Sequence, residues 1–527
     1  MANRSSGFAF LLCNRPTRRL PDAASALYFY ILPSGNQSIN EKPIRMKRTL
    51  WLLAAGVCLY VQAPAQSTKA AKPSPAQAAV KAGATNAAAS MPASTGAAST
   101  GARIKFTEFD LPNGLHVILH QDNSTPLVAV TMMYHVGSKN EQTTRTGFAH
   151  FFEHLLFEGS DNIQRGEYMK IVKGNGGQLN ANTSQDRTFY YEVMPSNKLE
   201  LGLYLESERL LHAKIDQKGV ETQREVVKEE KRQRIDNQPY GSIFTEVLKH
   251  AYTKHPYQWA PIGSLEHLNA ATIDEFRQFY KDFYVPNNAI LSIAGDIEPA
   301  QAKTLVTKYF AEIPKGTKAI YRPTIKEPAQ TKEVRDTIYD NITLPAVVQA
   351  YHIPGQGTPD SYAVEVLQTI LAGGESSRMN KEIVDKQQKA VQAAAFPVAN
   401  EDSGLFLTYS IANQGVKPND LEAAVNAEID RVKKELVTDA ELTKVKNQIE
   451  TNFVDQNARI FGVAENLANY KMYYGDANLI NTEIDRYNKV TKEDLRRVAN
   501  QYLRPENRVV LYYLPKAAEA KDTGKGK

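Results

Sequence analysis

An internal repeat is the feature that most constrains what this chain can fold into. The stretch from Thr491 to Asn507 repeats the pattern of the stretch from Thr272 to Asn288 at a constant offset. The matching pairs are Thr272 with Thr491, Phe276 with Leu495, Phe283 with Tyr502, Pro286 with Pro505, and Asn288 with Asn507. In both copies the pattern indicates a helix that leads into an apolar strand, at Ala289–Ala294 and at Arg508–Leu514. The two halves of the chain are therefore expected to fold as copies of one unit.

Strand and helix patterns alternate from residue 104 to about residue 516. A turn pattern at Leu111–Gly114 follows the first of three strand patterns near the start of the first copy. These strand patterns are Lys105–Phe109, Leu115–Leu119 and Leu127–Val136. About 410 residues are too many for one hydrophobic core. We therefore expect two domains, at residues 104–325 and 326–516, joined by a polar connector around Pro314–Glu333.

The start of the chain has the composition of targeting and linker segments. Residues 1–45 show no sustained periodicity, and we interpret them as an upstream mis-start, with Met46 as the true start. Residues 46–65 combine a basic start, an apolar run of about 12 residues and an Ala-Pro-Ala site, which is typical of a cleaved secretory signal. Residues 66–103 are rich in Ala, Ser and Pro and predict a disordered linker, and residues 517–527 form a tail. We expect a periplasmic or secreted protein with no stable membrane anchor after signal cleavage.

The first copy contains the metal-binding pattern His-x-x-Glu-His. Residues at i, i+3 and i+4 share one face of a helix, so His150, Glu153 and His154 should project together. Two imidazoles one turn apart can hold Zn²⁺, and a carboxylate beside them can take a proton from metal-bound water. Both cysteines of the chain lie within the first 65 residues, which are expected to be absent from the mature protein. The metal ligands must therefore come from histidines and carboxylates. The alternative is a buried amphipathic helix whose histidines bond to backbone groups.

The pattern resembles the inverted zinc motif of the pitrilysin/insulinase family of metallopeptidases, which includes the mitochondrial processing peptidase. Further segments similar to the family are Gly176–Ser184 with Thr188–Tyr191, Arg224–Glu230, and Gly373–Arg378. They resemble, in that order, the substrate strand, the helix of the third metal ligand, and a turn in the second domain. The resemblance implies an α+β fold of two homologous domains, each a mixed or antiparallel sheet packed with helices. It also implies a zinc endopeptidase with one Zn²⁺ per chain, held by His150, His154 and a third ligand.

The third ligand is sought on the helix pattern Glu221–Arg234, because a catalytic zinc site takes three protein groups and leaves one position for water. The resemblance favours Glu229 as this ligand, with Glu230 second. The alternative interpretation of so many charges is a solvated helix face. Many family members also carry an assisting Glu seven residues before the ligand. Thr222 occupies that position here and Glu221 lies one residue away, so no equivalent is expected.

The resemblance also implies a mechanism and a mode of substrate binding. Glu153 is expected to act as the general base that deprotonates the metal-bound water for attack on a peptide carbonyl. The segment Asn180-Ala181-Asn182 resembles the edge strand to which family substrates add as an extra strand. Recognition would then rest on main-chain hydrogen bonds and suit peptides or unfolded segments of varied sequence. The alternative for this segment is an ordinary loop and strand.

The second copy is expected to be degenerate. Extending the repeat into the metal helix places Glu365, Gln368 and Thr369 opposite the His/Glu/His set, so the second copy should be structural or substrate-binding. Active family members receive an Arg and a Tyr, seven residues apart, from the last domain of the opposite half. Val384 and Val391 occupy those positions here. We therefore hypothesise a partner chain, a homologous metal-free protein that supplies the Arg and Tyr, as in the mitochondrial processing peptidase.

A second function class is a non-catalytic structural or binding subunit of a larger complex. The intact His/Glu/His set favours the enzyme, because a structural relic needs no general base. The net charge of +5 over 527 residues is a mild excess, and no basic aromatic patch is present. The sequence therefore predicts no nucleic-acid partner.

Overall fold

The computed structural model describes residues 103–516, which belong to one compact unit. The predicted mis-start at 1–45, the signal peptide at 46–65, all but the last residue of the linker at 66–103, and the tail at 517–527 lie outside the described residues. These assignments stay predictions. Among the described residues, no helix is both long enough and apolar enough to span a bilayer.

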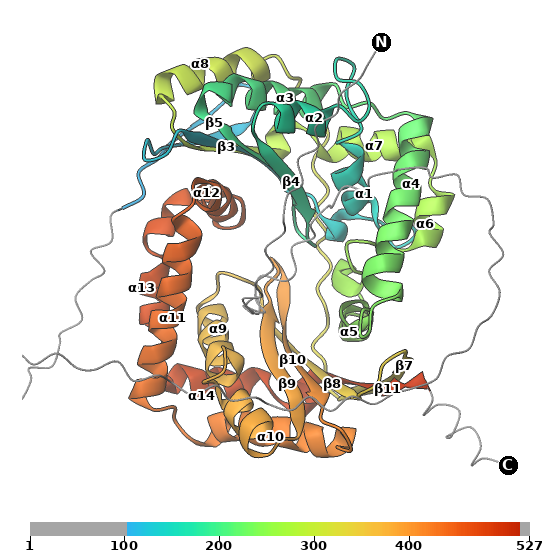
Figure 1. The fold of residues 1–527 in the computed structure, drawn as a ribbon, viewed down its shortest axis with the longest axis vertical. Helices are drawn as coiled ribbons and strands as arrows, with labels where there is room; N and C mark the ends of the chain where they lie inside the picture. Colours follow the sequence, from blue (N-terminus) through green and yellow to red (C-terminus); the bar gives the residue numbers. More distant parts are fainter. Residues whose placement is uncertain (1–102, 517–527) are drawn as a thin grey trace, which may run out of the picture. The chain divides into compact units, whose positions relative to one another are not determined.

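The first copy of the repeat forms a mixed sheet. Within residues 103–516, this sheet has the strand order β1-β2-β6-β3-β5-β4 (Figure 1). Its strands are β1 (Thr107–Asp110), β2 (His116–Gln121), β3 (Leu127–Tyr134), β4 (Gln178–Thr183), β5 (Thr188–Pro195) and β6 (Ala289–Gly295). β2 and β6 are parallel, and the other neighbours are antiparallel. The predicted turn before β2 is present, with Gly114 at φ +88° and its N–H donated to Leu111 O at 2.9 Å.

The second copy repeats this topology. The described residues form a second sheet with the order β7-β11-β8-β10-β9, in which β7 and β11 are parallel. Its strands are β7 (Val334–Asp340), β8 (Ala346–Pro354), β9 (Ala390–Val398), β10 (Ser403–Ala412) and β11 (Arg508–Pro515). Each strand of the second sheet occupies the position of its counterpart in the first sheet. The first sheet has one additional strand, β1. The expected α+β fold with two mixed sheets is confirmed.

Helices complete each copy. The first copy contains α1 (Phe148–Leu155), α2 (Tyr168–Gly174), α3 (Leu199–Leu211), α4 (Gln217–Lys231), α5 (Ile243–Ala251), α6 (Leu265–Ala270), α7 (Ile273–Phe283) and α8 (Pro299–Phe310). The second contains α9 (Pro359–Ala372), α10 (Pro418–Lys434), α11 (Asp439–Asn457), α12 (Ile460–Tyr474), α13 (Glu483–Asn488) and α14 (Lys492–Tyr502). The repeated helices α7 and α14 begin with the same capping box, Thr272 with Glu275 and Thr491 with Asp494. Both copies of the repeat therefore contain the residues that start this helix.

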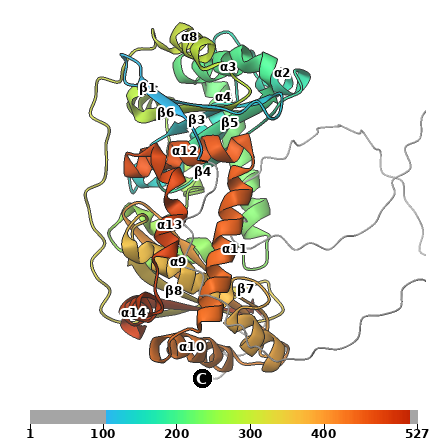
Figure 2. The same ribbon diagram turned by 90° about the vertical axis from the view of Figure 1, so that its left-hand side faces the viewer.

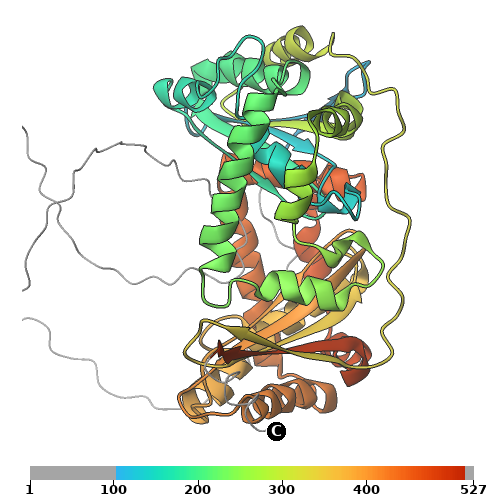
Figure 3. The same cartoon turned by 90° about the vertical axis from the view of Figure 1, so that its right-hand side faces the viewer.

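The two copies exchange one helix each. Helix α12 lies against β2, β3 and β6 of the first sheet (Figure 2). Val463 and Leu467 of this helix pack in one hydrophobic cluster with Ile118 and Met133 of the sheet. In return, α5 packs on β8 and β11 of the second sheet (Figure 3). The expected boundary between residues 325 and 326 stays a prediction, and this exchange means that neither copy covers its own sheet alone.

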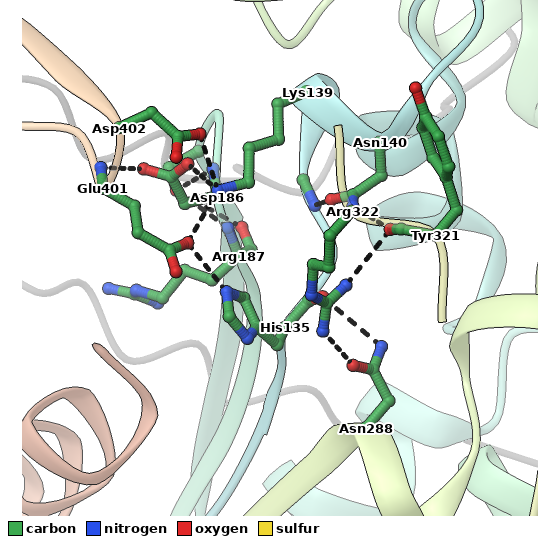
Figure 4. A network of polar contacts seen from close by, with 12 residues as sticks. His135, Lys139, Asn140, Asp186, Arg187, Asn288, Tyr321, Arg322, Glu401 and Asp402 are labelled. Carbon is green, nitrogen blue, oxygen red and sulfur yellow. Dashed lines mark hydrogen bonds and ion pairs between the residues drawn. The ribbon is translucent and has the colours of Figure 1, made fainter. Parts of the chain in front are cut away.

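An ionic cluster joins the β4–β5 turn of the first copy to the β9–β10 turn of the second (Figure 4). The Lys139 side chain is 3% exposed, and its Nζ lies 2.9 Å from Asp186, 2.6 Å from Glu401 and 3.3 Å from Asp402. The Glu401 N–H also donates to Asp186 Oδ2 at 3.0 Å. Lys139 follows β3 and immediately precedes the loop that leads into α1, so the second copy is tied to the segment that positions that helix.

Candidate metal centre

Helix α1 is held at its N-terminus by a buried carboxylate. The helix begins after Gly147, which has φ +97° and no side chain to cap it. Glu141 caps it instead, accepting the Gly147 and Ala149 N–H groups at 2.8 Å each and the Trp259 Nε1–H at 3.0 Å. Burial raises the pKa of Glu141 to about 8, and the backbone donors oppose that rise. A carboxylate at this end complements the helix dipole.

A buried arginine holds the other end of α1. Arg209 Nη1 donates to Leu156 O at 3.0 Å, directly after the helix. The guanidinium is buried between Glu192 at 3.4 Å and Glu206 at 3.1 Å. Its carbon also lies 4.2–4.6 Å from the ring centres of Phe157, Tyr168 and Tyr190. With both ends fixed, the orientation of α1 is determined by charge and packing together.

The buried face of α1 presents the His-x-x-Glu-His residues. His150, Glu153 and His154 are all buried, and one ligand atom from each lies within 4.8 Å of the others. Within the described residues, this is the group of His, Cys, Asp and Glu side chains that could hold a metal. Burial lowers the pKa of His150 to about 4 and raises the pKa of Glu153 to about 7. His150 is therefore neutral at pH 7, which is the form that binds a metal.

Helix α4 packs against α1 and adds a carboxylate to this group. Glu230 Oε2 lies 3.0 Å from His154 Nε2 and 3.6 Å from His150 Nε2. The Glu229 side chain is 47% exposed and pairs with Arg232 on the outer face. Glu230, the second choice from the sequence, is thus the glutamate that faces the histidines, whereas Glu229 faces away from them. One residue rotates a helix by about 100°, so the packing of α4 on α1 decides which glutamate faces the histidines.

The donor atoms fit a zinc ion. His154 Nε2 and Glu230 Oε2 are buried, and neither has a hydrogen-bond partner of acceptable geometry among residues 103–516. Buried polar atoms left in this way are costly unless something binds between them. Two imidazole nitrogens and one carboxylate oxygen are a usual ligand set for catalytic zinc. The chemistry and convergence of the donors therefore match the metal expected from the sequence.

The predicted substrate strand lies beside this group. β4 contacts α1, and within the described residues it pairs with β5 alone, so it is an edge strand of the sheet. Asn180 is partly exposed and accepts the Ala181 N–H at 2.9 Å. Asn182 is buried and accepts from Arg187 Nη1 at 3.0 Å. The backbone edge of β4 is thus placed next to the helix that carries the candidate ligands.

The second copy carries no comparable group in the part of the chain that is described. Glu365 is partly buried and accepts a hydrogen bond from Tyr487, Gln368 donates to Ala395 O at 2.6 Å, and Thr369 bonds within its own helix. These side chains have partners inside the second copy. Val391, one of the positions where an Arg/Tyr pair was sought, is 48% exposed on β9.

Sequence analysis missed the residues that position α1 and Glu230. Glu141 lies outside any motif, and its capping role depends on the loop between β3 and α1. Arg209 reaches α1 from α3 through the core. Arg234 pairs with Glu230 Oε1 at 2.8 Å, and the i, i+4 spacing of an acid and a base was a signal that could have found it.

Comparisons with known proteins converge on one family. The family pattern described as insulinase (peptidase family M16) matches residues 116–262, and the pattern described as the peptidase M16 inactive domain matches residues 270–449. The chain is 32% identical to the zinc protease PqqE of Helicobacter pylori over 414 residues, which cover 78% of this chain and 93% of PqqE. It is 24% identical to an Arabidopsis thaliana protein described as a mitochondrial-processing peptidase subunit beta, over 75% of each chain.

Solved structures show the same relationship. A protease from Helicobacter pylori superposes with a TM-score of 0.75 at 31% identity, over 78% of this chain and 100% of that one. The periplasmic protease PqqL from Escherichia coli gives a TM-score of 0.66 at 21% identity, over 79% of this chain and 48% of PqqL. The second likeness shows a shared fold.

Proposed function

Since the chain belongs to peptidase family M16, the insulinase family, we propose that it is a zinc-dependent endopeptidase that hydrolyses peptides or unfolded segments. The observation that carries the proposal is the convergence of Glu230 Oε2 on the two histidine nitrogens, with Glu153 beside them. The similarity to the zinc protease PqqE agrees with it. The metal is part of the proposal and comes from the donor set and the family.

His150, His154 and Glu230 would hold one Zn²⁺ and leave a position for water and for the substrate carbonyl. When bound, the ion would lower the pKa of that water and polarise the carbonyl. Glu153 is placed on the same helix face to accept the proton of the attacking water and then to donate it to the leaving amine.

Peptides would bind by adding a strand to β4. The backbone edge of Asn180, Ala181 and Asn182 supplies main-chain donors and acceptors beside α1, so recognition would depend weakly on sequence. The Arg187 contacts to Asn182 at 3.0 Å and to Glu465 at 2.7 Å support the end of this strand from the second copy.

We also propose that the chain works with a homologous metal-free partner that supplies an Arg and a Tyr. Val384 and Val391 occupy the positions where this chain would have to carry them. The likeness to a peptidase described as subunit beta supports a two-chain arrangement. The fold of this chain covers 48% of PqqL, so a partner of similar size would complete the longer arrangement. A periplasmic location rests on the signal pattern at 46–65 and on that likeness.

The test is hydrolysis of a mixed library of quenched fluorescent peptides by the zinc-loaded chain, with Glu153→Gln and Glu229→Gln as paired variants. Glu153→Gln removes the general base and should abolish any cleavage that the wild-type chain shows. Silence of the wild-type chain with zinc bound would agree with the partner requirement, and the two variants would then be compared in the presence of the partner. Glu229→Gln changes a neighbouring exposed carboxylate and should leave cleavage intact. Cleavage by the isolated chain at full rate would overturn the partner requirement. Cleavage that survives Glu153→Gln would overturn the mechanism.

The second candidate function is a non-catalytic subunit. The match of residues 270–449 to the M16 inactive domain favours it, together with the two valines. If the wild-type chain takes up no zinc when it is loaded for the cleavage assay, that result would favour the non-catalytic subunit.

A further inference from the structure

The two carboxylate oxygens of Glu230 contact different partners. Its Oε2 faces the histidine nitrogens, and its Oε1 lies 2.8 Å from Arg234 Nη1. The Glu230 side chain is 10% exposed, and that of Arg234 is 31% exposed. We propose that Arg234 is a positioning residue, which orients Glu230 for zinc; this inference rests on the proposed function.

The local backbone places Arg234 for this task. Helix α4 ends in a π-helical turn, η3 (Arg232–Asp236), in which the Asn237 N–H donates to Arg232 O at 2.9 Å. Such turns are rare and occur often at functional sites. Beyond the turn, Tyr240 donates its N–H to Asp340 Oδ2 at 2.9 Å and its hydroxyl to Leu344 O at 2.6 Å. The end of the segment that carries Arg234 is therefore fixed to the second copy.

The electrostatics of the site require such a cation. A ligand carboxylate that gives one oxygen to a metal needs a donor for the other oxygen, and such outer partners orient the ligand. Charge-assisted hydrogen bonds from arginine are the stronger kind.

A neighbouring pair on the same helix supplies the control. Arg232 pairs with Glu229 on the outer face, where their side chains are 59% and 47% exposed. The two pairs consist of the same residue types within one helical turn. A variant at Arg232 therefore removes an arginine and a helix-surface ion pair without touching the candidate metal centre.

The experiment measures zinc affinity of the full chain by competition with a chromophoric chelator, with circular dichroism as the check of folding. Arg234→Met should weaken zinc binding about 10- to 100-fold. Arg234→Lys should recover part of this loss, because it keeps the charge and loses the planar fork. Arg232→Met should change the affinity less than about twofold. Equal zinc affinity for Arg234→Met and Arg232→Met would overturn the inference.

A double variant separates positioning from general destabilisation. If Arg234 acts through Glu230, then adding Arg234→Met to Glu230→Gln should cause little further loss of zinc affinity. A full additional loss in the double variant would show that Arg234 acts by another route and would overturn the assignment. A wild-type chain that binds no zinc would overturn the proposed function itself, whereas stoichiometric wild-type binding with no effect of Arg234→Met would overturn this inference alone.

Discussion

Replacing Lys139 with methionine should weaken the joint between the two copies of the repeat. Its ammonium group is 3% exposed and contacts three carboxylates, those of Asp186, Glu401 and Asp402. Glu401 and Asp402 are 30% and 42% exposed, so water can solvate them after the change. Asp186 is 4% exposed and would remain as a buried charge without a cation, held only by hydrogen bonds from the Glu401 N–H and the Tyr257 hydroxyl. Leaving one such charge costs about 3–5 kcal/mol.

That loss of unfolding free energy can be converted into a decrease of the melting temperature, Tm. Unfolding entropy is about 2.1 cal/mol/K per residue, so roughly 410 residues give about 0.9 kcal/mol/K. The Tm of Lys139→Met should therefore fall by about 3 to 6 °C. Differential scanning calorimetry of the metal-free chain measures this shift, and separate melting of the two copies would appear as a broadened or divided transition.

The control is an exposed ion pair elsewhere in the first copy, and the refuting result comes from the Lys139 cluster itself. Lys318→Met removes an exposed lysine that is 2.8 Å from Asp282 and should leave Tm unchanged. Adding Asp186→Asn to Lys139→Met removes the stranded charge and should restore part of the lost stability. A Tm loss below about 1 °C for Lys139→Met, or a double variant as unstable as the sum of the single variants, would refute the reasoning.

Three further predictions follow from the same structure. Glu230→Gln should weaken zinc binding by more than about 100-fold while Glu229→Gln has no effect, as measured by chelator competition, and the reverse order would restore Glu229 as the ligand. Arg209→Lys keeps the buried charge but loses the planar stacking on three rings, and calorimetry should show a loss of about 2 kcal/mol; an unchanged Tm would contradict it. The hydrogen bond with His255 lowers the pKa of Asp402 from 3.8 to about 2, so its stabilisation is present above pH 3.8 and lost as pH falls toward 2. Asp402→Asn should flatten the fall of Tm with pH in that window, and an unaltered slope would exclude this role.

The sequence predicted local geometry and repetition well because both depend on short-range patterns. Apolar periodicity placed β3, β6 and β11 close to their observed bounds, and the Gly114 turn was set by a backbone angle that suits glycine. The repeat at Thr272 and Thr491 predicted two copies, and the two sheets share one strand order apart from the additional strand β1 in the first. The grouping of His150, Glu153 and His154 needed nothing beyond the helical period.

What the sequence by itself determined, then, is the α+β repeat and the face of α1 that carries the His/Glu/His set, since hydrophobic period and residue spacing act within one element. Tertiary structure decided the rest. Which of Glu229 and Glu230 faces the histidines depends on how α4 is rotated against α1, because the side chains of adjacent helix residues point about 100° apart. The exchange of α5 and α12 and the buried support from Arg209 join residues far apart in the chain, and the cap from Glu141 depends on how the loop before α1 folds onto the helix. Such contacts are set by packing and charge neutralisation in the folded core, which no local pattern records.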